Sequence, residues 1–179
     1  VLVCLINRAT RLAQFLLTGT KMYEAELCLG VDTETQDFTG QEIKRRPVPA
    51  LTDSEINRIF NQFVGWLEQM PPAYSALKHK GVALYKLARR GQVVQKPARR
   101  VRIDRLQINE VALPKISFVV GCSAGTYIRT LCADIGQAFG CGGHLSALRR
   151  TRSSGFDIDE AIRLEDLTDC VSDPPTPTW

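Results

Sequence analysis

Carboxylates and thiols are the first groups in the sequence that could do chemistry. Asp32, Glu34 and Asp37 stand close together, and oxygen ligands of this kind bind hard metal ions. The run lacks the glycine and the distal glutamate of a calcium-binding loop. Cys141 and His144 could supply two zinc ligands, but no second Cys/His pair stands at ligand spacing. The sequence therefore predicts no metal site and no bound cofactor.

Nucleotide-binding and hydrolase motifs are also missing. Residues 121–125 lead from a predicted strand into a predicted helix, as a phosphate-binding loop would. They contain neither Gly-x-Gly-x-x-Gly nor a following Gly-Lys-Ser/Thr, so we expect no nucleotide site. Ser123 and the two histidines, His79 and His144, stand in no motif typical of a catalytic triad.

Basic side chains are concentrated in residues 78–105. This segment holds ten Lys/Arg and one acidic residue, a net charge of +9, whereas the whole chain carries only +4 and the remainder therefore −5. A second basic group occupies 149–152. Such clustering is typical of a polyanion-binding face, although a solvated surface is the alternative. Tyr74 and Tyr85 beside these bases could stack on nucleobases, which favours RNA.

Hydrophobic periodicity predicts the elements that must position these residues. Strands and helices mix along the chain, which favours an α+β fold with a mixed, largely antiparallel sheet and flanking helices. The predicted helices are 7–18, 52–64 (opened by a Thr52–Glu55 capping box), 83–90 and 126–139; the predicted strands are 23–29, 101–103 and 116–122, with a loop over 32–40.

Length and composition favour one ordinary globular domain, or one domain with a small appendage. The chain has 179 residues, of which 44% are hydrophobic and 23% charged. Its longest apolar run, Val1 to Ile6, is far shorter than the roughly 20 residues that cross a bilayer. The six cysteines form no Cys-x-x-Cys pair, so we expect a reduced, cytoplasmic protein. We also expect a monomer.

Three stretches together resemble the TruB family of tRNA pseudouridine synthases. The first comprises Lys21-Met22-Tyr23 and the loop from Leu29 to Gly40, the second runs from Gln69 to Gly91, and the third runs from Cys122 to Thr151. The spacing between Pro72 and Gly91 is similar to the bacterial tRNA enzymes rather than to the dyskerin branch. The resemblance covers residues 1–167.

The resemblance implies an enzyme that isomerises uridine to pseudouridine in the T-loop of tRNA, at position 55, through a covalent aspartate adduct and without a cofactor. Such enzymes flip the target base out of its stack. Residues 1–167 would form the central and C-terminal part of the catalytic domain, and 168–179 a Pro-rich tail.

Four residues take roles from this resemblance. Tyr23 matches the tyrosine that packs on the flipped uracil and handles its proton. Tyr127 matches a second pocket tyrosine, Leu148 a leucine at the pocket edge, and Arg129 the arginine that pairs with the nucleophilic aspartate. Judged singly, each has an ordinary structural reading in the core or on the surface. We expect all four to border one cavity. The charge pattern adds expected RNA contacts at Lys78, Arg89, Arg99, Arg100, Arg149 and Arg150.

One departure from the family pattern concerns the chemistry itself. The family's nucleophile lies in a Gly-x-x-Gly-Thr-Leu-Asp-type loop, and no aspartate of this chain stands in that motif. From the resemblance we also expect this sequence to lack the family's opening strand and the small C-terminal RNA-binding module that many relatives carry. We therefore expect the chain alone to be inactive. A non-catalytic RNA-binding module and an inactive fragment remain the alternatives.

Overall fold

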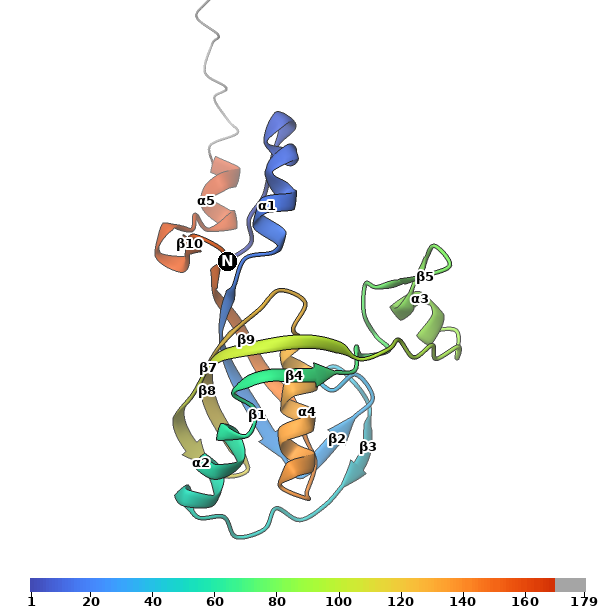
Figure 1. Cartoon of the computed structure of the whole chain (residues 1–179), viewed down its shortest axis with the longest axis vertical. Helices are drawn as coiled ribbons and strands as arrows, with labels where there is room; N and C mark the ends of the chain where they lie inside the picture. The colour runs from blue at the N-terminus through green and yellow to red at the C-terminus, as the bar shows by residue number, and fades with distance from the viewer. Residues whose placement is uncertain (170–179) are drawn as a thin grey trace, which may run out of the picture.

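The computed structural model describes residues 1–169 and is built around one six-stranded sheet (Figure 1). The strand order is β10-β9-β1-β8-β7-β4, and every pairing in this sheet is antiparallel. This confirms the α+β class, while the sheet is antiparallel throughout its described strands and not mixed. The strands are β1 (Lys21–Leu29), β4 (Gly65–Gln69), β7 (Arg99–Ala112), β8 (Lys115–Cys122), β9 (Gly143–Ser153) and β10 (Phe156–Asp157).

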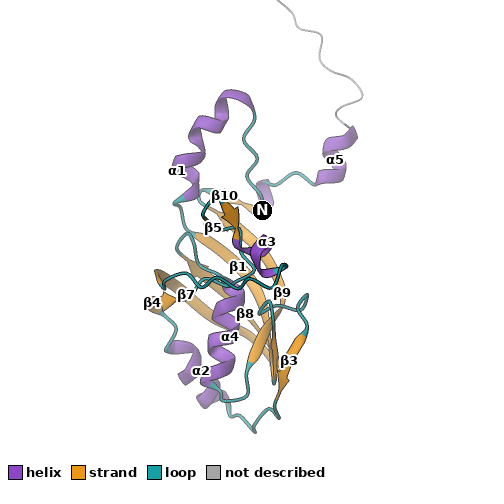
Figure 2. Cartoon of the chain, turned by 90° about the vertical axis from the view of Figure 1, so that its right-hand side faces the viewer, coloured by secondary structure: helices purple, strands orange, loops and turns teal. Residues whose placement is uncertain are grey.

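Two helices, α2 (Asp53–Asn61) and α4 (Ile128–Ala138), bury one face of this sheet, here called the inner face (Figure 2). Alternate residues of β1, from Ala25 to Leu29, point into this core and are at most 6% exposed. Phe60 of α2 packs edge-on against Phe118 of β8, with 5.6 Å between ring centroids. The opposite, outer face carries the alternating polar residues of the same strands.

The predicted capping box forms as expected. Thr52 Oγ accepts from the Glu55 backbone N–H at 3.3 Å, and the Glu55 carboxylate accepts from the Thr52 N–H at 2.8 Å. The helix ends at Asn61 instead of Val64, because the chain turns and Gly65, with φ +104°, begins β4. The predicted helix 83–90 is the shorter α3 (Leu84–Ala88), and the predicted helix 126–139 is α4 with Tyr127 as its N-cap.

Several strands escape prediction. β9 pairs along the whole of β1, but register shifts at two points break its alternation, so its sequence shows no period of two. The other unpredicted strands are short: β4, β10, the ribbon of β2 (Val31–Thr33) and β3 (Glu42–Arg45), and the ribbon of β5 (Lys78–His79) and β6 (Val82–Ala83).

Two appendages extend from the sheet. At one end lie η1 (Asn7–Leu12) and α1 (Ala13–Leu17), which replace the single helix predicted over 7–18, with η2 (Ile158–Glu160) and α5 (Leu164–Asp169) nearby (Figure 1). Residues 70–98, here called the basic insert, project sideways between β4 and β7 (Figure 1). The predicted tail 168–179 lies outside the described residues except for the last two residues of α5. No helix in 1–169 is long and apolar enough to span a membrane.

The close crossing of α4 and β9 generates a stability prediction. A Cβ on Gly136 would lie 2.3 Å from the Gly143 nitrogen and 2.4 Å from the Gly142 carbonyl carbon, both of them backbone atoms. Gly136→Ala should therefore lower the free energy of unfolding by roughly 1–3 kcal/mol, measured by urea denaturation. Alanine is the better helix former by about 1 kcal/mol, so a loss must be steric. Gly155→Ala is the control, since nothing lies within 4 Å of its Cβ; equal midpoints for the two variants would refute the prediction.

Candidate functional site

Arg129, in the first turn of α4, joins three segments that are distant in sequence. Its guanidinium donates to the Thr35 carbonyl at 3.4 Å and to the Tyr74 carbonyl, and it pairs with the Asp37 carboxylate at 3.2 Å. The Arg129 side chain is only 19% exposed. A guanidinium suits this position because it presents several donors and keeps its charge. Arg129 thus holds α4, the loop after β2 and the base of the basic insert together.

The Asp37 carboxylate organises that loop from within. One oxygen accepts from the hydroxyls of Thr35 at 2.7 Å and Thr39 at 2.5 Å and from the Thr39 N–H at 3.0 Å, while the other oxygen faces Arg129. Partial burial would raise the pKa of Asp37, but the threonine hydrogen bonds and the charge of Arg129 together lower it. Asp37 is therefore ionised at neutral pH, with its oxygens occupied by protein donors.

Gln69, at the end of β4, fixes the residue that begins α4. Its side-chain carbonyl accepts from the Tyr127 N–H at 2.8 Å, and its amide donates to the Tyr127 carbonyl at 3.0 Å. Gln69 is 3% exposed, and Tyr127 caps α4 without a side-chain capping bond of its own. The carboxamide of Gln69 consequently sets the backbone that carries both Tyr127 and Arg129. The Arg129 guanidinium lies 5.9 Å from the Tyr127 ring centroid.

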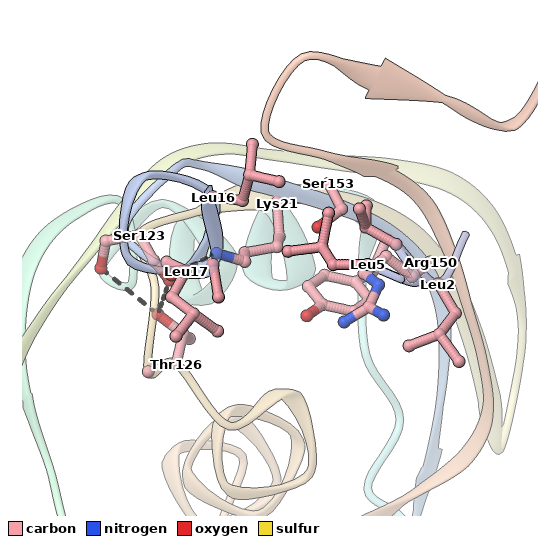
Figure 3. A pocket seen from close by; sticks show the side chains of 13 residues that line it. Leu2, Leu5, Leu16, Leu17, Lys21, Ser123, Thr126, Arg150 and Ser153 are labelled. Atoms are coloured by element: carbon pink, nitrogen blue, oxygen red, sulfur yellow. Dashed lines mark hydrogen bonds between the residues drawn. The ribbon is translucent and has the colours of Figure 1, made fainter. Parts of the chain in front are cut away.

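Tyr23 lines a cavity of about 490 Å³ at the end of the sheet near α1. Figure 3 shows Leu16 and Leu17 of α1 and Leu2 and Leu5 of the N-terminal segment around it, with Lys21 between them. The Lys21 ammonium donates to the carbonyls of Leu17 at 2.8 Å and Gly19 at 2.6 Å, which closes the C-terminal end of α1. The polar part of the remaining wall comprises Ser123, Thr126, Arg150 and Ser153.

Burial governs the protonation of Tyr23. Desolvation raises the pKa of its phenol, although a hydrogen bond with Arg150 works in the opposite direction. Tyr23 is therefore neutral at physiological pH and keeps a proton that it can donate. In the pairing of β1 with β9, Tyr23 lies opposite Arg150, and opposed residues share a face of the sheet.

The expectation of one shared cavity is wrong in part. Tyr23 and Arg129 do lie on the same side of the sheet, since Tyr23 packs against the core that α4 covers. However, the cavity beside Tyr23 is lined by neither Tyr127, Arg129 nor Leu148. The N-terminal segment and α1 close over Tyr23, whereas Arg129 turns toward Asp37. Leu148 of β9 lies opposite Ala25 of β1 and is 48% exposed. It borders a different hollow, beside Glu24 and Glu26.

The predicted RNA contacts fall into two places. Lys78 and Arg89 are exposed on the basic insert, and Arg99 and Arg100 are exposed where it joins β7. The insert itself contains six Lys/Arg and no acidic residue. The structure separates the other two arginines from this group: exposed Arg149 pairs with Glu24 at 3.6 Å, and Arg150 lines the cavity and donates to the Val1 carbonyl at 2.7 Å.

The carboxylates considered as metal ligands do not converge. Asp32 pairs with Arg46 and accepts from the Gly143 N–H at 3.1 Å, Glu34 accepts from the Tyr74 hydroxyl, and Asp37 is occupied as described above. These contacts tie the loop to β9 and to the insert. His144 is within 2.9 Å of the Val31 carbonyl through Nδ1, and across residues 1–169 no group of three or more potential ligands comes together.

Comparison with known proteins identifies the family. Residues 1–128 match the model of the TruB family pseudouridylate synthase N-terminal domain, and residues 129–174 match the tRNA pseudouridylate synthase B C-terminal domain. The chain therefore belongs to the TruB family. It is 48% identical over 167 residues to tRNA pseudouridine synthase B of Alkaliphilus oremlandii and 48% identical over 165 residues to that of Syntrophotalea carbinolica. These alignments cover 93% and 92% of this chain but only 56% and 54% of the relatives, so the chain spans about half of their length.

Solved structures support the same fold. A Cbf5-Nop10-Gar1 complex contains a chain that superposes with a TM-score of 0.67 at 32% identity, over 92% of this chain and 40% of that one. An H/ACA RNP bound to a substrate RNA containing 2'-deoxyuridine gives a TM-score of 0.64 at 28% identity, over 92% and 38%. The pseudouridine synthase fold expected from the resemblance is confirmed.

Sequence reasoning missed the supporting residues Asp37 and Gln69. The sequence presents Asp37 as a metal-ligand candidate and as part of the family loop, and Gln69 as part of a family motif. Their signals were present in the sequence, as a carboxylate flanked by two threonines and as a polar residue ending an otherwise alternating segment. Neither pattern specifies the distant partner.

The two hydrogen bonds between Gln69 and the Tyr127 backbone generate a stability prediction. Gln69→Ala would leave the half-buried Tyr127 N–H without its partner and the Tyr127 carbonyl with only the Leu131 N–H, at a cost of roughly 1–3 kcal/mol in the free energy of unfolding. Urea denaturation measures the loss. Gln62→Ala, on an exposed glutamine after α2, is the matched control and should change stability little. Equal stability of the two variants would show that the Gln69 carboxamide does not support Tyr127.

Proposed function

We propose that this chain provides the RNA-holding part of a tRNA pseudouridine synthase that isomerises uridine in the T-loop, at position 55. The observation that carries the proposal is the placement of Arg129: a nearly buried cation held beside Tyr127, on the side of the sheet that also presents Tyr23. Membership of the TruB family and the name of the relatives support the reaction and the substrate class. The expectation of a monomer in the cytoplasm rests on the sequence alone.

The side chains support distinct steps of this reaction. Isomerisation breaks the N-glycosidic bond, turns the uracil and rejoins it through carbon, which requires a flipped base. Tyr23, an aromatic ring with a retained phenolic proton, can pack on the uracil and exchange a proton with it. Arg129 carries the fixed charge that would orient a carboxylate nucleophile. Asp37 is a poor candidate for the nucleophile because protein donors already engage both of its oxygens.

A non-catalytic RNA-binding module is the second candidate. It is favoured by one observation, that no aspartate of these 179 residues stands in the family's nucleophile motif. The two candidates share the RNA-binding surface and differ only in turnover.

Both candidates predict salt-dependent RNA binding. Phosphate contacts release counterions, so the affinity for a labelled tRNA should fall steeply as salt rises. A test from roughly 50 to 200 mM salt covers the range in which such losses of affinity are large. Arg89→Ala with Arg99→Ala should weaken binding and reduce the slope of log affinity against log salt by about 1 to 2. Lys44→Ala with Arg58→Ala, which removes two exposed charges elsewhere, should leave both unchanged. Affinity insensitive to salt would exclude this surface.

Turnover separates the two candidates. Uridine tritiated at carbon 5 releases tritium when the isomerisation occurs, and the 179-residue chain alone should release none. A chimera in which the corresponding preceding segment of the Alkaliphilus oremlandii relative is joined at Val1 should release it. In that chimera, Arg129→Ala should lower turnover far more than RNA binding, with Arg129→Lys as the variant that keeps the charge.

Each other result has a definite meaning. A folded chimera that binds tRNA without releasing tritium would favour the non-catalytic module. Release by the 179-residue chain itself would assign the nucleophile to one of its own carboxylates, and loss of that release in Asp37→Asn would identify Asp37.

A further inference from the structure

The outer face of the sheet carries an exposed tryptophan between arginines. Trp66 of the edge strand β4 is 57% exposed. The Arg100 guanidinium carbon lies 4.4 Å from a Trp66 ring centroid, and that of Arg102 lies 5.9 Å from it. In the pairing of β4 with β7, Trp66 stands directly opposite Arg102. These three residues are here called the Trp66 patch.

The patch is continuous with the basic insert. β7 begins at Arg99, where the insert ends, and Arg100 and Arg102 follow as exposed residues of that strand. A polyanion bound to the insert can therefore also contact the guanidinium groups of Arg100 and Arg102, which directly follow the insert in sequence. Glu68 stands opposite Arg100, and Arg102 also contacts Asp104, so the patch is less basic than the insert, and the indole is its distinguishing group.

The patch is also connected to the cavity beside Tyr23. Arg102 and Ser123 exchange two hydrogen bonds: the Ser123 N–H donates to the Arg102 carbonyl at 2.8 Å, and the Arg102 N–H donates to Ser123 Oγ at 2.9 Å. Ser123 itself lines the cavity. The backbone under the Trp66 patch is thus hydrogen-bonded to the cavity wall.

We propose that the Trp66 patch is a stacking site for an unpaired nucleobase of the bound RNA, with Arg100 and Arg102 contacting the adjoining phosphates. Indole rings stack on any base, and arginine combines stacking with phosphate binding. The inference rests on the proposed RNA-binding function and adds a contact on the face of the sheet opposite α4. It predicts a preference for RNA with unpaired bases at this site.

Tryptophan emission tests the proposal directly. The sequence has two tryptophans, so Trp179→Phe, in the part of the chain outside the described residues, leaves Trp66 as the sole indole. A single-stranded RNA should quench the Trp66 emission, whereas an abasic oligomer of the same length and charge should not. Anisotropy of a labelled copy of the same RNA measures binding in parallel.

Substitutions provide the second measurement. Trp66→Ala should weaken the binding of the single-stranded RNA by about five- to tenfold, and Trp66→Phe, which keeps a ring, should weaken it less. Phe156→Ala, on an aromatic side chain that is 43% exposed on β10, is the matched control and should have no effect. Circular dichroism checks that each variant is folded.

The outcomes distinguish this inference from the proposed function. RNA binding with unchanged Trp66 emission and unchanged affinity of Trp66→Ala would overturn the stacking site and leave the proposed function standing. Equal quenching by the abasic oligomer would also overturn stacking, since phosphate contact would suffice. Absence of RNA binding altogether would overturn both.

Discussion

The Arg129 guanidinium is the interaction on which the candidate site depends. It connects the start of α4 to a loop 92 to 94 residues away in sequence and to the first residues of the basic insert. Because its side chain is largely buried, removing it would leave the Asp37 carboxylate and the Tyr74 carbonyl without this donor in a poorly solvated place. One cation therefore holds both the loop and the first residues of the insert against the start of α4.

Strand β4 extends this constraint to the nucleic-acid surface. Its last residue, Gln69, holds the backbone of Tyr127, while Trp66 on its outer face stacks with Arg100 of β7. The basic insert begins directly after Gln69 and ends just before Arg99, the first residue of β7. RNA bound to the insert is therefore connected directly to β4 and β7. The buried faces of these two strands belong to the core that α4 also covers. Strand β4 thus contacts both the exposed Trp66 patch and the start of α4.

Features encoded by neighbouring residues could be predicted from the sequence. Features that depend on contacts between distant segments could not. The alternation of β1, the capping box of α2 and the start of α4 near Tyr127 are encoded by neighbouring residues and are confirmed. β9 was missed because register shifts interrupt its alternation, and β4 because it has only five residues. Gln69, Asp37 and Trp66 take their roles from partners on other strands and helices. The resemblance supplied Tyr23, Tyr127, Arg129 and Leu148, whose roles stay predictions, and it did not indicate that the N-terminal segment closes over Tyr23.

That N-terminal segment determines where a longer chain would approach the site. The Val1 nitrogen donates to the Arg150 carbonyl at 2.6 Å, and Arg150 donates back to the Val1 carbonyl, so the first residue is held against β9. Arg150 stands opposite Tyr23 in the sheet. An amide nitrogen at Val1 would keep the same hydrogen bond, so a polypeptide joined there would enter the structure beside Tyr23. A carboxylate carried on such a segment would enter close to the Tyr23 phenol. To pair with Arg129, it would have to extend along the inner face of the sheet past Thr126. The Arg129 guanidinium would then have to exchange the Asp37 carboxylate for the new one. The competition between these two carboxylates for one guanidinium is the electrostatic problem that a complete active site on this fold has to solve.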